Sequence, residues 1–445
     1  MECLGVNVVV LGMARSGIAL AEFLKSRGAR VRAVDEKPLE ELPEAARVVR
    51  RYNIPFCRQG PGAFDRAACV VVSPGVPPDL DLLEDARRNG VEVIGEVEFA
   101  SRFLEGNTIG ITGSNGKTTT TALVGHLLRE SGIPVQVGGN IGTPVTALLA
   151  SSRPGQWNVL ELSSFQLETV HQFRAHIAVA LNVTPDHLDR HRTFAAYAAA
   201  KARLFETQTA EDFAVLSADD PSCLAYASLT RARPLRFSLT RPVTPGAWLE
   251  GNRLLLDGEP FLSTCDIPLR GRHNIENVLA AAVVARLAGV SLASIAAAVP
   301  TFPGVEHRLE FVRRVRGVDY YNDSKATNVD AALKAIDSFA GPLWIVLGGK
   351  DKGSDYAPLG PPLQAKAKAA LLIGAAAPKI AAAIGESVPL VECGSIDRAV
   401  EAAYRRAAAG DTVLLAPACA SFDQFENFEH RGRVFKELVA RLEGD

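Results

Sequence analysis

The sequence lacks paired cysteines, long apolar runs and an excess of charge of either sign. Its seven cysteines include no C-x-x-C pair, which argues against a disulfide framework or a zinc site and fits a reducing compartment. No run approaches the roughly 18 apolar residues that a bilayer-spanning helix needs, so we expect no membrane insertion. A formal net charge of −2 gives no electrostatic basis for binding nucleic acid.

Signals for secretion, short repeats and low-complexity segments are absent as well. The first residues carry no basic segment or cleavage site, and residues 6–11 are typical of a first β-strand followed by a glycine turn. A chain of 445 residues suggests roughly three domains, and 47% hydrophobic content is ordinary for a globular protein. We therefore expect a cytoplasmic globular protein.

A glycine-rich loop, TGSNGKT at residues 112–118, follows a short apolar strand and opens a helix predicted to end near residue 131. Backbone N–H groups at such a turn face an anion, Lys117 neutralises phosphate charge, and the Thr118 hydroxyl can bind Mg²⁺. The spacing is not a strict Walker A, because Gly110 lies one residue too far from Gly116 and Lys117. The loop predicts nucleoside triphosphate binding, with an unliganded glycine loop as the alternative.

The first segment, residues 1–98, alternates continuous apolar strands with helices, which predicts a parallel sheet covered on both faces. Its first turn, GMARSG at residues 12–17, is a variant of the dinucleotide fingerprint, and Asp35 ends the second predicted strand. This signal is weak on its own. It favours a Rossmann-like domain for another nucleotide or phosphate ligand over an intact NAD site.

The second segment, residues 99–302, contains the phosphate loop and three further candidates for chemistry. Glu161 ends an apolar strand, where it can bind Mg²⁺ together with Thr118. His187 lies among acids after the next strand and fits either a metal or substrate site or a capped turn. Lys201 lies on an alanine-rich helix, and its spacing alone favours a side chain that extends to solvent.

The third segment, residues 303–445, again alternates strands and helices and predicts a second doubly wound sheet. Polar clusters follow three of its predicted strands, at residues 322–328, 348–352 and 416–423. Because the carboxyl ends of parallel strands surround the ligand crevice, these clusters indicate a second binding surface.

Together these motifs resemble the Mur ligases over essentially the whole chain. Five strings are typical of the wider family: TGSNGKTTT (112–120), GGNIG (138–142), ELSSFQLE (161–168), NVTPDHLDRH (182–191) and GRHNIEN (271–277). Four strings of the last segment are typical of the member that adds D-glutamate: HRLE (307–310), YNDSKATN (321–328), GGKDKG (348–353) and PACASFDQFENFEHRG (417–432). A linked set of this length is far more specific than a single loop.

The resemblance implies an α/β fold of three domains: a Rossmann-like domain for the UDP-substrate (1–98), a central P-loop-type ATPase domain (99–302) and a Rossmann-like amino-acid-binding domain (303–445). It implies a monomeric ligase that uses ATP to phosphorylate the L-alanine carboxylate of UDP-N-acetylmuramoyl-L-alanine. The amine of D-glutamate then attacks the acyl phosphate. Two Mg²⁺ ions and a lysine carbamate formed with CO₂ are the implied cofactors.

The resemblance also assigns residues to each ligand. The implied catalytic residues are Lys117, Glu161, His187 and Lys201, the last as the carbamylated lysine. The implied metal ligands are Thr118, Glu161, His187 and Lys201. The implied nucleotide contacts are Gly113, Ser114, Asn115, Gly116, Lys117, Thr118, Thr119, Asn140, Asn274, Asn277, Arg308 and Asp323. The implied contacts to the UDP-substrate are Ala14, Arg15, Ser16, Asp35, Lys37, Gly75, Asn140 and His187. The implied D-glutamate contacts are Lys325, Thr327, Lys352, Ser421 and Phe428.

Four other functions compete with this interpretation. A sister ligase would add a different amino acid, although the D-N-P-R string of the diamino-acid member is absent. A folylpolyglutamate synthase-like ligase generally lacks a separate domain like residues 1–98. An NAD-dependent oxidoreductase would leave the Lys117 loop unexplained. A non-enzymatic nucleotide-gated protein would give the carboxylate and lysine set no role.

Overall fold

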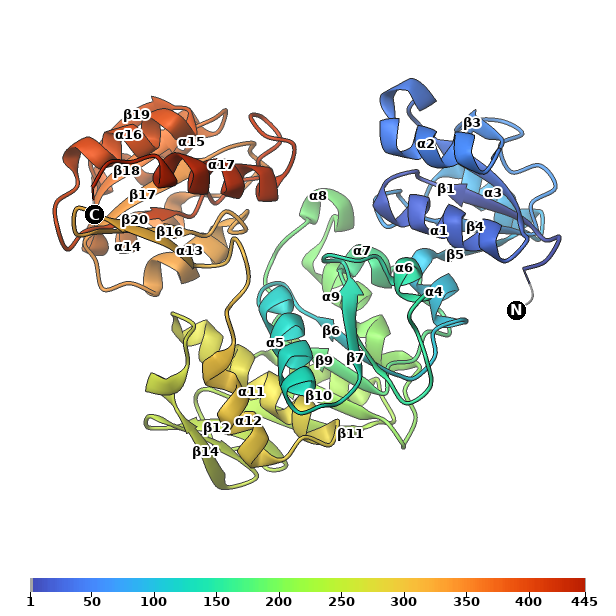
Figure 1. Cartoon of the computed structure of the whole chain (residues 1–445), viewed down its shortest axis with the longest axis horizontal. Helices are drawn as coiled ribbons and strands as arrows, with labels where there is room; N and C mark the ends of the chain where they lie inside the picture. The colour runs from blue at the N-terminus through green and yellow to red at the C-terminus, as the bar shows by residue number, and fades with distance from the viewer. Residues whose placement is uncertain (1–2, 445) are drawn as a thin grey trace. The chain divides into compact units, whose positions relative to one another are not determined.

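The computed structural model describes residues 3–444 and contains three β-sheets with helices packed on their faces (Figure 1). Contacts divide the chain into two compact units. One runs to Leu262 and adds Val278–Ala298, and the other consists of Ser263–Asn277 and the chain from Val299 onward. The α/β class with three sheet-centred domains is confirmed. The boundaries at residues 98 and 302 stay predictions.

The first sheet has five strands in the order β3-β2-β1-β4-β5, and all neighbours are parallel. The strands are β1 (Asn7–Leu11), β2 (Arg30–Asp35), β3 (Phe56–Arg58), β4 (Cys69–Val72) and β5 (Glu92–Gly95). The helices are α1 (Arg15–Ser26), α2 (Pro43–Arg51), α3 (Asp81–Arg88) and α4 (Glu96–Ser101). Val8 and Val10 pack with α1 and α2, whereas Val9 and Leu11 pack with α3. Burial on both faces explains why these strands are continuously apolar.

The central sheet has nine strands in the order β14-β13-β12-β11-β10-β9-β6-β8-β7. Neighbours from β7 to β12 are parallel, and β12 and β13 form an antiparallel hairpin. The strands are β6 (Asn107–Thr112), β7 (Val135–Gly139), β8 (Trp157–Glu161), β9 (Ile177–Ala180), β10 (Phe213–Ser217), β11 (Arg233–Ser238), β12 (Gly246–Glu250), β13 (Arg253–Leu256) and β14 (Glu259–Ser263). A turn at Gly251, where φ is +58°, separates β12 from β13.

The helices of this region begin with the one that follows the glycine-rich loop. They are α5 (Lys117–Glu130), α6 (Val145–Leu148), α7 (Ser164–Leu167), α8 (Leu188–His191), α9 (Phe194–Glu206), α10 (Pro221–Ala225), α11 (Arg272–Leu287) and α12 (Leu292–Ala298). Strand β6 lies between β8 and β9, so the segments that follow three neighbouring parallel strands share one edge of the sheet.

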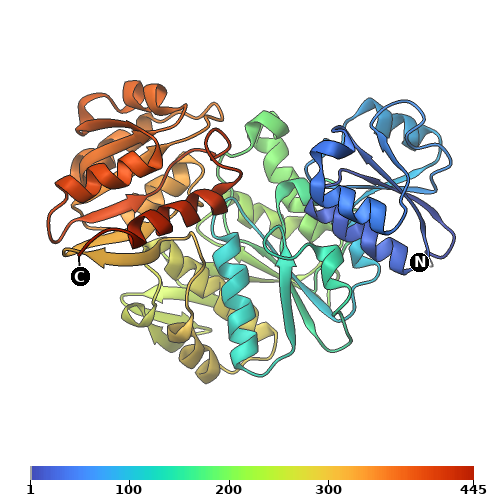
Figure 2. The same ribbon diagram turned by 45° about the horizontal axis from the view of Figure 1, so that its top comes forward.

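The third sheet has six strands in the order β15-β16-β20-β17-β18-β19, and its neighbours are parallel except for β15 with β16. The strands are β15 (Glu310–Val315), β16 (Val318–Asn322), β17 (Leu343–Gly348), β18 (Ala367–Ile373), β19 (Leu390–Gly394) and β20 (Thr412–Leu415). The helices are α13 (Val329–Asp337), α14 (Gly360–Lys366), α15 (Ala377–Ile384), α16 (Ile396–Arg406) and α17 (Phe428–Ala440). Ile345 and Leu347 pack with α13 to α15, and Trp344 and Val346 pack with α16 and α17. Figure 2 shows α17 alongside this sheet.

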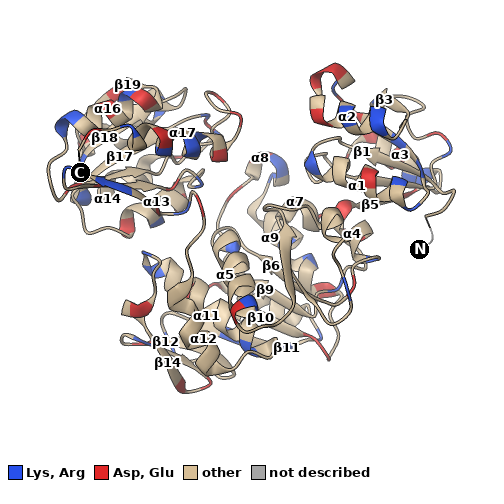
Figure 3. Ribbon diagram, viewed as in Figure 1, with Lys and Arg blue, Asp and Glu red and all other residues tan. Residues whose placement is uncertain are grey.

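Charged residues occur on elements of all three sheets and on their helices. Lys and Arg lie among Asp and Glu on helices such as α16 and α17, without a block of one sign (Figure 3). Within residues 3–444, no helix combines the length and apolar character needed to cross a bilayer.

Candidate functional site

The glycine-rich loop connects β6 to α5 through two residues with left-handed backbone. Gly113 has φ +154°, and a Cβ there would approach the Leu181 Cβ to 3.1 Å. Gly116 has φ +84° and precedes the first residue of α5. A side chain at either position would be strained, so these glycines allow the backbone to turn tightly into the helix. The strand–loop–helix context that a phosphate loop requires is present.

Polar groups after β9 hold the loop in place. The Asn182 Oδ1 accepts a hydrogen bond from the Asn115 N–H at 2.8 Å, and its Nδ2 donates to the Asn115 carbonyl at 3.1 Å. The Ser114 Oγ donates to the Thr184 carbonyl at 2.9 Å and lies 3.0 Å from the Tyr197 hydroxyl. These contacts preorganise the backbone of the loop before any ligand binds.

Two lysines converge on one carbonyl of the loop. The Nζ atoms of Lys117 and Lys201 donate to the Gly113 carbonyl at 2.8 and 2.7 Å. Lys201 is 1% exposed, so the interpretation from its helix pattern alone, which the resemblance had already set aside, is wrong. Its Nζ lies 4.5 Å from the Tyr197 ring centroid. Burial, followed by the nearby charge of Lys117, lowers the pKa of Lys201 well below its ordinary value, which favours the neutral amine.

Glu161, at the end of β8, pairs in register with Ile111 of the strand that leads into the loop. Its Oε1 accepts a hydrogen bond from the Asn140 Nδ2 at 2.8 Å. Its Oε2 is buried and has no hydrogen-bond partner among the described residues. A buried carboxylate oxygen without a donor is costly, and a cation would satisfy it. Thr118, buried at the start of α5, supplies a hydroxyl on the helix that follows the loop. This donor set fits Mg²⁺.

His187 precedes α8 in a left-handed conformation with φ +53°. Its side chain is 39% exposed, and its Nε2 lies 3.7 Å from the Asp186 Oδ2. The imidazole packs edge-on against Phe165 at a ring-centroid distance of 4.8 Å. His187 is therefore an accessible imidazole beside a carboxylate, and not a buried core residue.

A cavity of about 210 Å³ lies in the first unit between the turn after β1 and the segments after β7. Five residues assigned to the UDP-substrate line it: Ala14, Arg15, Ser16, Gly75 and Asn140. The Arg15 guanidinium donates to the Gly142 carbonyl at 2.8 Å across one side of the cavity. Its other lining residues were not assigned from the sequence and are Ser73, Pro74, Gly139, Gly142, Pro144 and Gln166.

Asp35 and Lys37 do not line this cavity. Asp35 shapes the turn beside it, because its carboxylate accepts hydrogen bonds from the Met13 N–H at 2.6 Å and the Lys37 N–H at 3.0 Å. The turn also depends on Gly17, where a Cβ would lie 1.9 Å from the Gly12 carbonyl oxygen. Gly17 is therefore required sterically, because a side chain there would clash with the Gly12 carbonyl. Asp35, at the end of β2, holds the backbone of the turn through its hydrogen bonds.

The second unit contains the four other residues assigned to the nucleotide. The buried Asn274 and Asn277 lie in the first turns of α11, and the Asn277 Nδ2 donates to the Asn274 Oδ1 at 2.9 Å. The Asp323 carboxylate accepts from the Leu309 N–H at 3.3 Å. Burial raises the pKa of Asp323 to about 6, although the charge of Arg308 opposes this shift. The fold therefore brings Asn274 next to Asn277, and the charge of Arg308 near Asp323.

The residues assigned to D-glutamate follow three strands of the third sheet or begin α17. The Lys325 Nζ lies 3.7 Å from the Phe428 ring centroid, and the Thr327 N–H donates to the Lys325 carbonyl at 2.8 Å. Ser421 is buried in the segment after β20, whereas Lys352 is exposed in the loop after β17. The structure brings Lys325 and Phe428 into direct contact.

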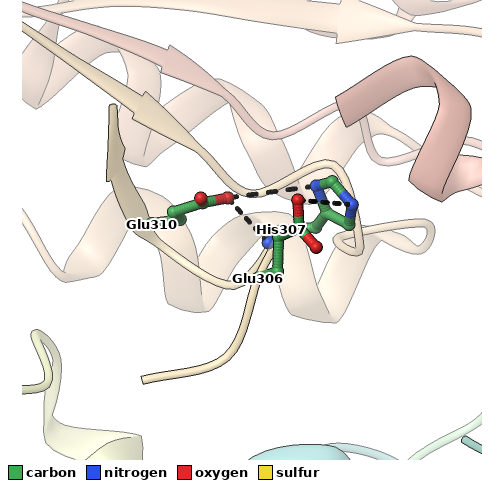
Figure 4. Close-up of side chains that lie close together, drawn as sticks. All are labelled: Glu306, His307 and Glu310. Carbon is green, nitrogen blue, oxygen red and sulfur yellow. Dashed lines mark hydrogen bonds and ion pairs between the residues drawn. The ribbon is translucent and has the colours of Figure 1, made fainter. Parts of the chain in front are cut away.

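Glu306, His307 and Glu310 form a cluster at the start of β15 with the composition of a metal site (Figure 4). The His307 Nε2 lies 3.7 Å from a Glu306 oxygen, and the Glu310 Oε2 accepts from the His307 N–H at 3.0 Å. The Lys436 ammonium, however, already pairs with Glu306 at 3.0 Å and with Glu310 at 2.5 Å. This lysine supplies the positive charge, so the cluster serves as an ion-pair network beside Arg308.

Sequence reasoning assigned no role to Arg431 or Tyr356, which are buried beneath the polar clusters of the third sheet. Tyr356 donates to the Asp351 Oδ1 at 2.8 Å. Arg431, Phe435 and Val439 recur every four residues along α17, and all three are buried. An arginine in an apolar helical stripe was the available signal, because arginine is seldom fully buried without partners.

Comparison with known families finds three matches along the chain. The description "Mur ligase MurD-like, N-terminal domain" matches residues 6–95, and "Mur ligase middle domain" matches residues 111–285. The description "Mur ligase, glutamate ligase domain" matches residues 307–419. The matches follow one another in the order of the three sheets.

Curated relatives are similar over the full length. A protein of Solibacter usitatus named UDP-N-acetylmuramoylalanine--D-glutamate ligase is 63% identical, covering 100% of this chain and 99% of that one. A protein of Acidobacterium capsulatum with the same name is 51% identical, covering 100% and 98%.

Solved structures share the fold at low identity. A UDP-N-acetylmuramate-alanine ligase of Thermotoga maritima has a TM-score of 0.61 at 18% identity, covering 98% of this chain and 99% of that one. A pseudomurein peptide ligase of Methanothermus fervidus has a TM-score of 0.62 at 18% identity, covering 99% and 100%.

Proposed function

The chain belongs to the Mur ligase family, and from this premise we propose that it joins D-glutamate to UDP-N-acetylmuramoyl-L-alanine at the expense of ATP. The product is a precursor of peptidoglycan. The substrate assignment is supported by the names of the full-length relatives. The ligase chemistry rests on one observation: a phosphate loop lies beside a buried carboxylate oxygen that has no hydrogen-bond partner within residues 3–444.

ATP is needed because a free carboxylate is a poor electrophile. Transfer of the γ-phosphoryl group to the L-alanine carboxylate gives an acyl phosphate and ADP, and attack by the D-glutamate amine then forms the amide and releases phosphate. Such transfer depends mainly on positioning and charge neutralisation. The loop N–H groups and Lys117 bind the β- and γ-phosphates, and Asn274, Asn277, Arg308 and Asp323 bind the remainder of the nucleotide.

Glu161, Thr118, His187 and Lys201 are the residues we assign to two Mg²⁺ ions. Bound Mg²⁺ neutralises the charge of the transferred phosphoryl group and orients its oxygens. Glu161 offers an oxygen that no described donor uses, and Asn140 fixes the other one. The depressed pKa of Lys201 leaves a neutral amine that can add to CO₂ with loss of a proton, and the resulting carbamate would carry one negative charge shared by two oxygens.

The other substrates are assigned to two further groups of residues. The cavity lined by Ala14, Arg15, Ser16 and Gly75 seats the UDP-substrate, with Asp35 and Lys37 beside it. Lys325, Thr327, Lys352, Ser421 and Phe428 bind D-glutamate. Lys352 is the residue we assign to a substrate carboxylate. We place the reaction in the cytoplasm. Its product is needed to maintain cell shape and for cell division. We expect the enzyme to be a monomer.

The test measures phosphate release from ATP with Mg²⁺, UDP-N-acetylmuramoyl-L-alanine and a panel of amino acids. We expect release to depend on D-glutamate and to match the amount of amide product. Release with L-alanine or a diamino acid instead would contradict the substrate assignment and indicate a sister ligase. Absence of release with every amino acid would contradict the ligase function.

A further inference from the structure

Arg431 is almost completely buried, at 1% exposed, yet no carboxylate pairs with it among the described residues. Its three guanidinium nitrogens donate instead to oxygens of two loops. Nε donates to the Ser324 Oγ at 3.0 Å, and Nη2 donates to the Ser324 carbonyl at 2.8 Å and the Cys419 carbonyl at 3.2 Å. Nη1 donates to the Cys419 and Ala420 carbonyls at 3.2 and 3.3 Å.

These oxygens belong to loops that contain the proposed D-glutamate residues. Ser324 directly precedes Lys325, and Ala420 directly precedes Ser421. The Ser324 Oγ also donates to the Phe428 carbonyl at 2.8 Å, at the first residue of α17. One guanidinium therefore connects the loop after β16, the loop after β20 and the start of α17.

The loop after β17, which contains Lys352, packs against the same group. A Cβ on Gly349 would lie 3.2 Å from the Arg431 Nη1 and 2.2 Å from the Ala420 carbonyl oxygen. The Lys350 N–H donates to that carbonyl at 2.9 Å. All three polar clusters of the third sheet thus meet around Arg431.

No other side chain offers the number and geometry of N–H donors that these oxygens accept from. A guanidinium is planar and presents five N–H donors in a fixed fork, whereas a lysine ammonium presents three from a single point. Burial lowers the pKa of Arg431 to about 10, which still leaves it charged at neutral pH. Carbonyl dipoles from several directions stabilise this charge, and the charge of Asp423 acts in the same sense without pairing directly with the guanidinium.

We propose that Arg431 is the positioning residue of the D-glutamate pocket, fixing Lys325, Ser421 and Phe428 relative to one another without touching the substrate. This inference rests on the proposed function, because it presumes that these three side chains bind the amino acid. Loss of the guanidinium is then expected to weaken binding of the amino acid far more than binding of the UDP-substrate, whose assigned residues lie in the other unit.

The test compares Arg431→Lys with Arg433→Lys, an exposed arginine on the same helix. We expect Arg431→Lys to raise KM for D-glutamate by about tenfold or more, because buried carbonyls lose their donors and the loops shift. KM for the UDP-substrate should change less than about twofold, and Arg433→Lys should leave both constants unchanged. An unchanged KM for D-glutamate, with only the yield or unfolding temperature lowered, would overturn the proposal.

Ser324→Ala provides a second, milder test should Arg431→Lys fail to fold. It removes the hydroxyl that joins Arg431 to Phe428 while leaving the guanidinium its carbonyl acceptors. We expect KM for D-glutamate to rise several-fold with KM for the UDP-substrate unchanged, and equal effects on both would overturn the proposal.

The wild-type enzyme, assayed first with the amino-acid panel, separates the substrate assignment from the role proposed for Arg431. If it uses another amino acid, the substrate assignment fails, and the same comparison of KM values is made with that amino acid.

Discussion

Glu161 and Arg431 are both buried charged residues near the carboxyl ends of parallel strands, but their hydrogen bonding differs. Glu161 has one oxygen bound to Asn140 and one that no described donor reaches. Arg431 has hydrogen bonds from each of its three nitrogens. Burial of an unsatisfied charge is costly, so an incomplete set of partners indicates a place for a ligand. A complete set indicates support for neighbouring loops.

Glu161→Gln tests the incomplete site and has the largest expected effect. The amide keeps the shape and can still contact Asn140, but it is a much weaker metal ligand. We expect ligase activity to fall by about a thousandfold. Phosphate release measured across a range of Mg²⁺ concentrations checks this, with the exposed Glu130→Gln as a control. Activity within about tenfold of wild type would contradict the assignment of Glu161 as a metal ligand.

For the free energy of unfolding, we expect substitution of Arg431 to have a larger effect than substitution of Glu161. Arg431→Met leaves several buried carbonyls without donors, and we expect the free energy of unfolding to fall by about 3 kcal/mol. Glu161→Gln removes a buried charge that lacks a full set of partners, and we expect stability to stay equal or rise by about 1 kcal/mol. Chemical denaturation of both variants without ligands provides the comparison. Equal destabilisation by both would mean that hydrogen-bond completeness does not distinguish the two sites.

His273, near the start of α11, is a half-buried ionisable residue whose charge state depends on pH. Burial, with the charges of Lys334 and Arg308, lowers its pKa from 6.5 to about 4. As the pH falls from 6.5 towards 4, the unfolded chain takes up a proton before the folded protein does, so stability decreases. We expect wild type to lose on the order of 2 kcal/mol more than His273→Gln over this range. Denaturation at several pH values measures the difference, and the exposed His171→Gln should follow wild type.

The smallest expected effect concerns the helix that positions Lys201. The Thr193 side chain accepts a hydrogen bond from the Ala196 N–H at 3.1 Å and caps α9. We expect Thr193→Ala to lower the free energy of unfolding by about 1 kcal/mol. Thr193→Ser keeps the hydroxyl and should recover most of this loss in thermal denaturation. If Thr193→Ala lowered the free energy of unfolding as much as Arg431→Met, Thr193 would contribute more to stability than a helix cap does.

Local sequence predicted the strand, glycine turn and helix around residues 112–118 well, because glycine spacing and strand-to-helix context are properties of neighbouring residues. Lys201 was different. Its alanine-rich surroundings suggested an exposed lysine, whereas the Tyr197 ring, one turn earlier on α9, and the distant Gly113 carbonyl bury it. Arg431 was missed for the same reason, since its partners lie in loops that the sheet order brings together. Contacts between residues far apart in the sequence give no local sequence pattern. The only sign of them is a charged residue at a position where the helix is otherwise apolar.

The position of β1 in the first sheet has a consequence for how the chain is made. Although β1 is the first strand in the sequence, it lies between β2 and β4 at the centre of the sheet. Synthesis from the N-terminus completes β1 at Leu11, but β4 does not begin until Cys69. A nascent chain that ends between these points leaves one edge of β1 open. Until β4 emerges from the ribosome, that edge can pair with another chain, and the first sheet closes only afterwards.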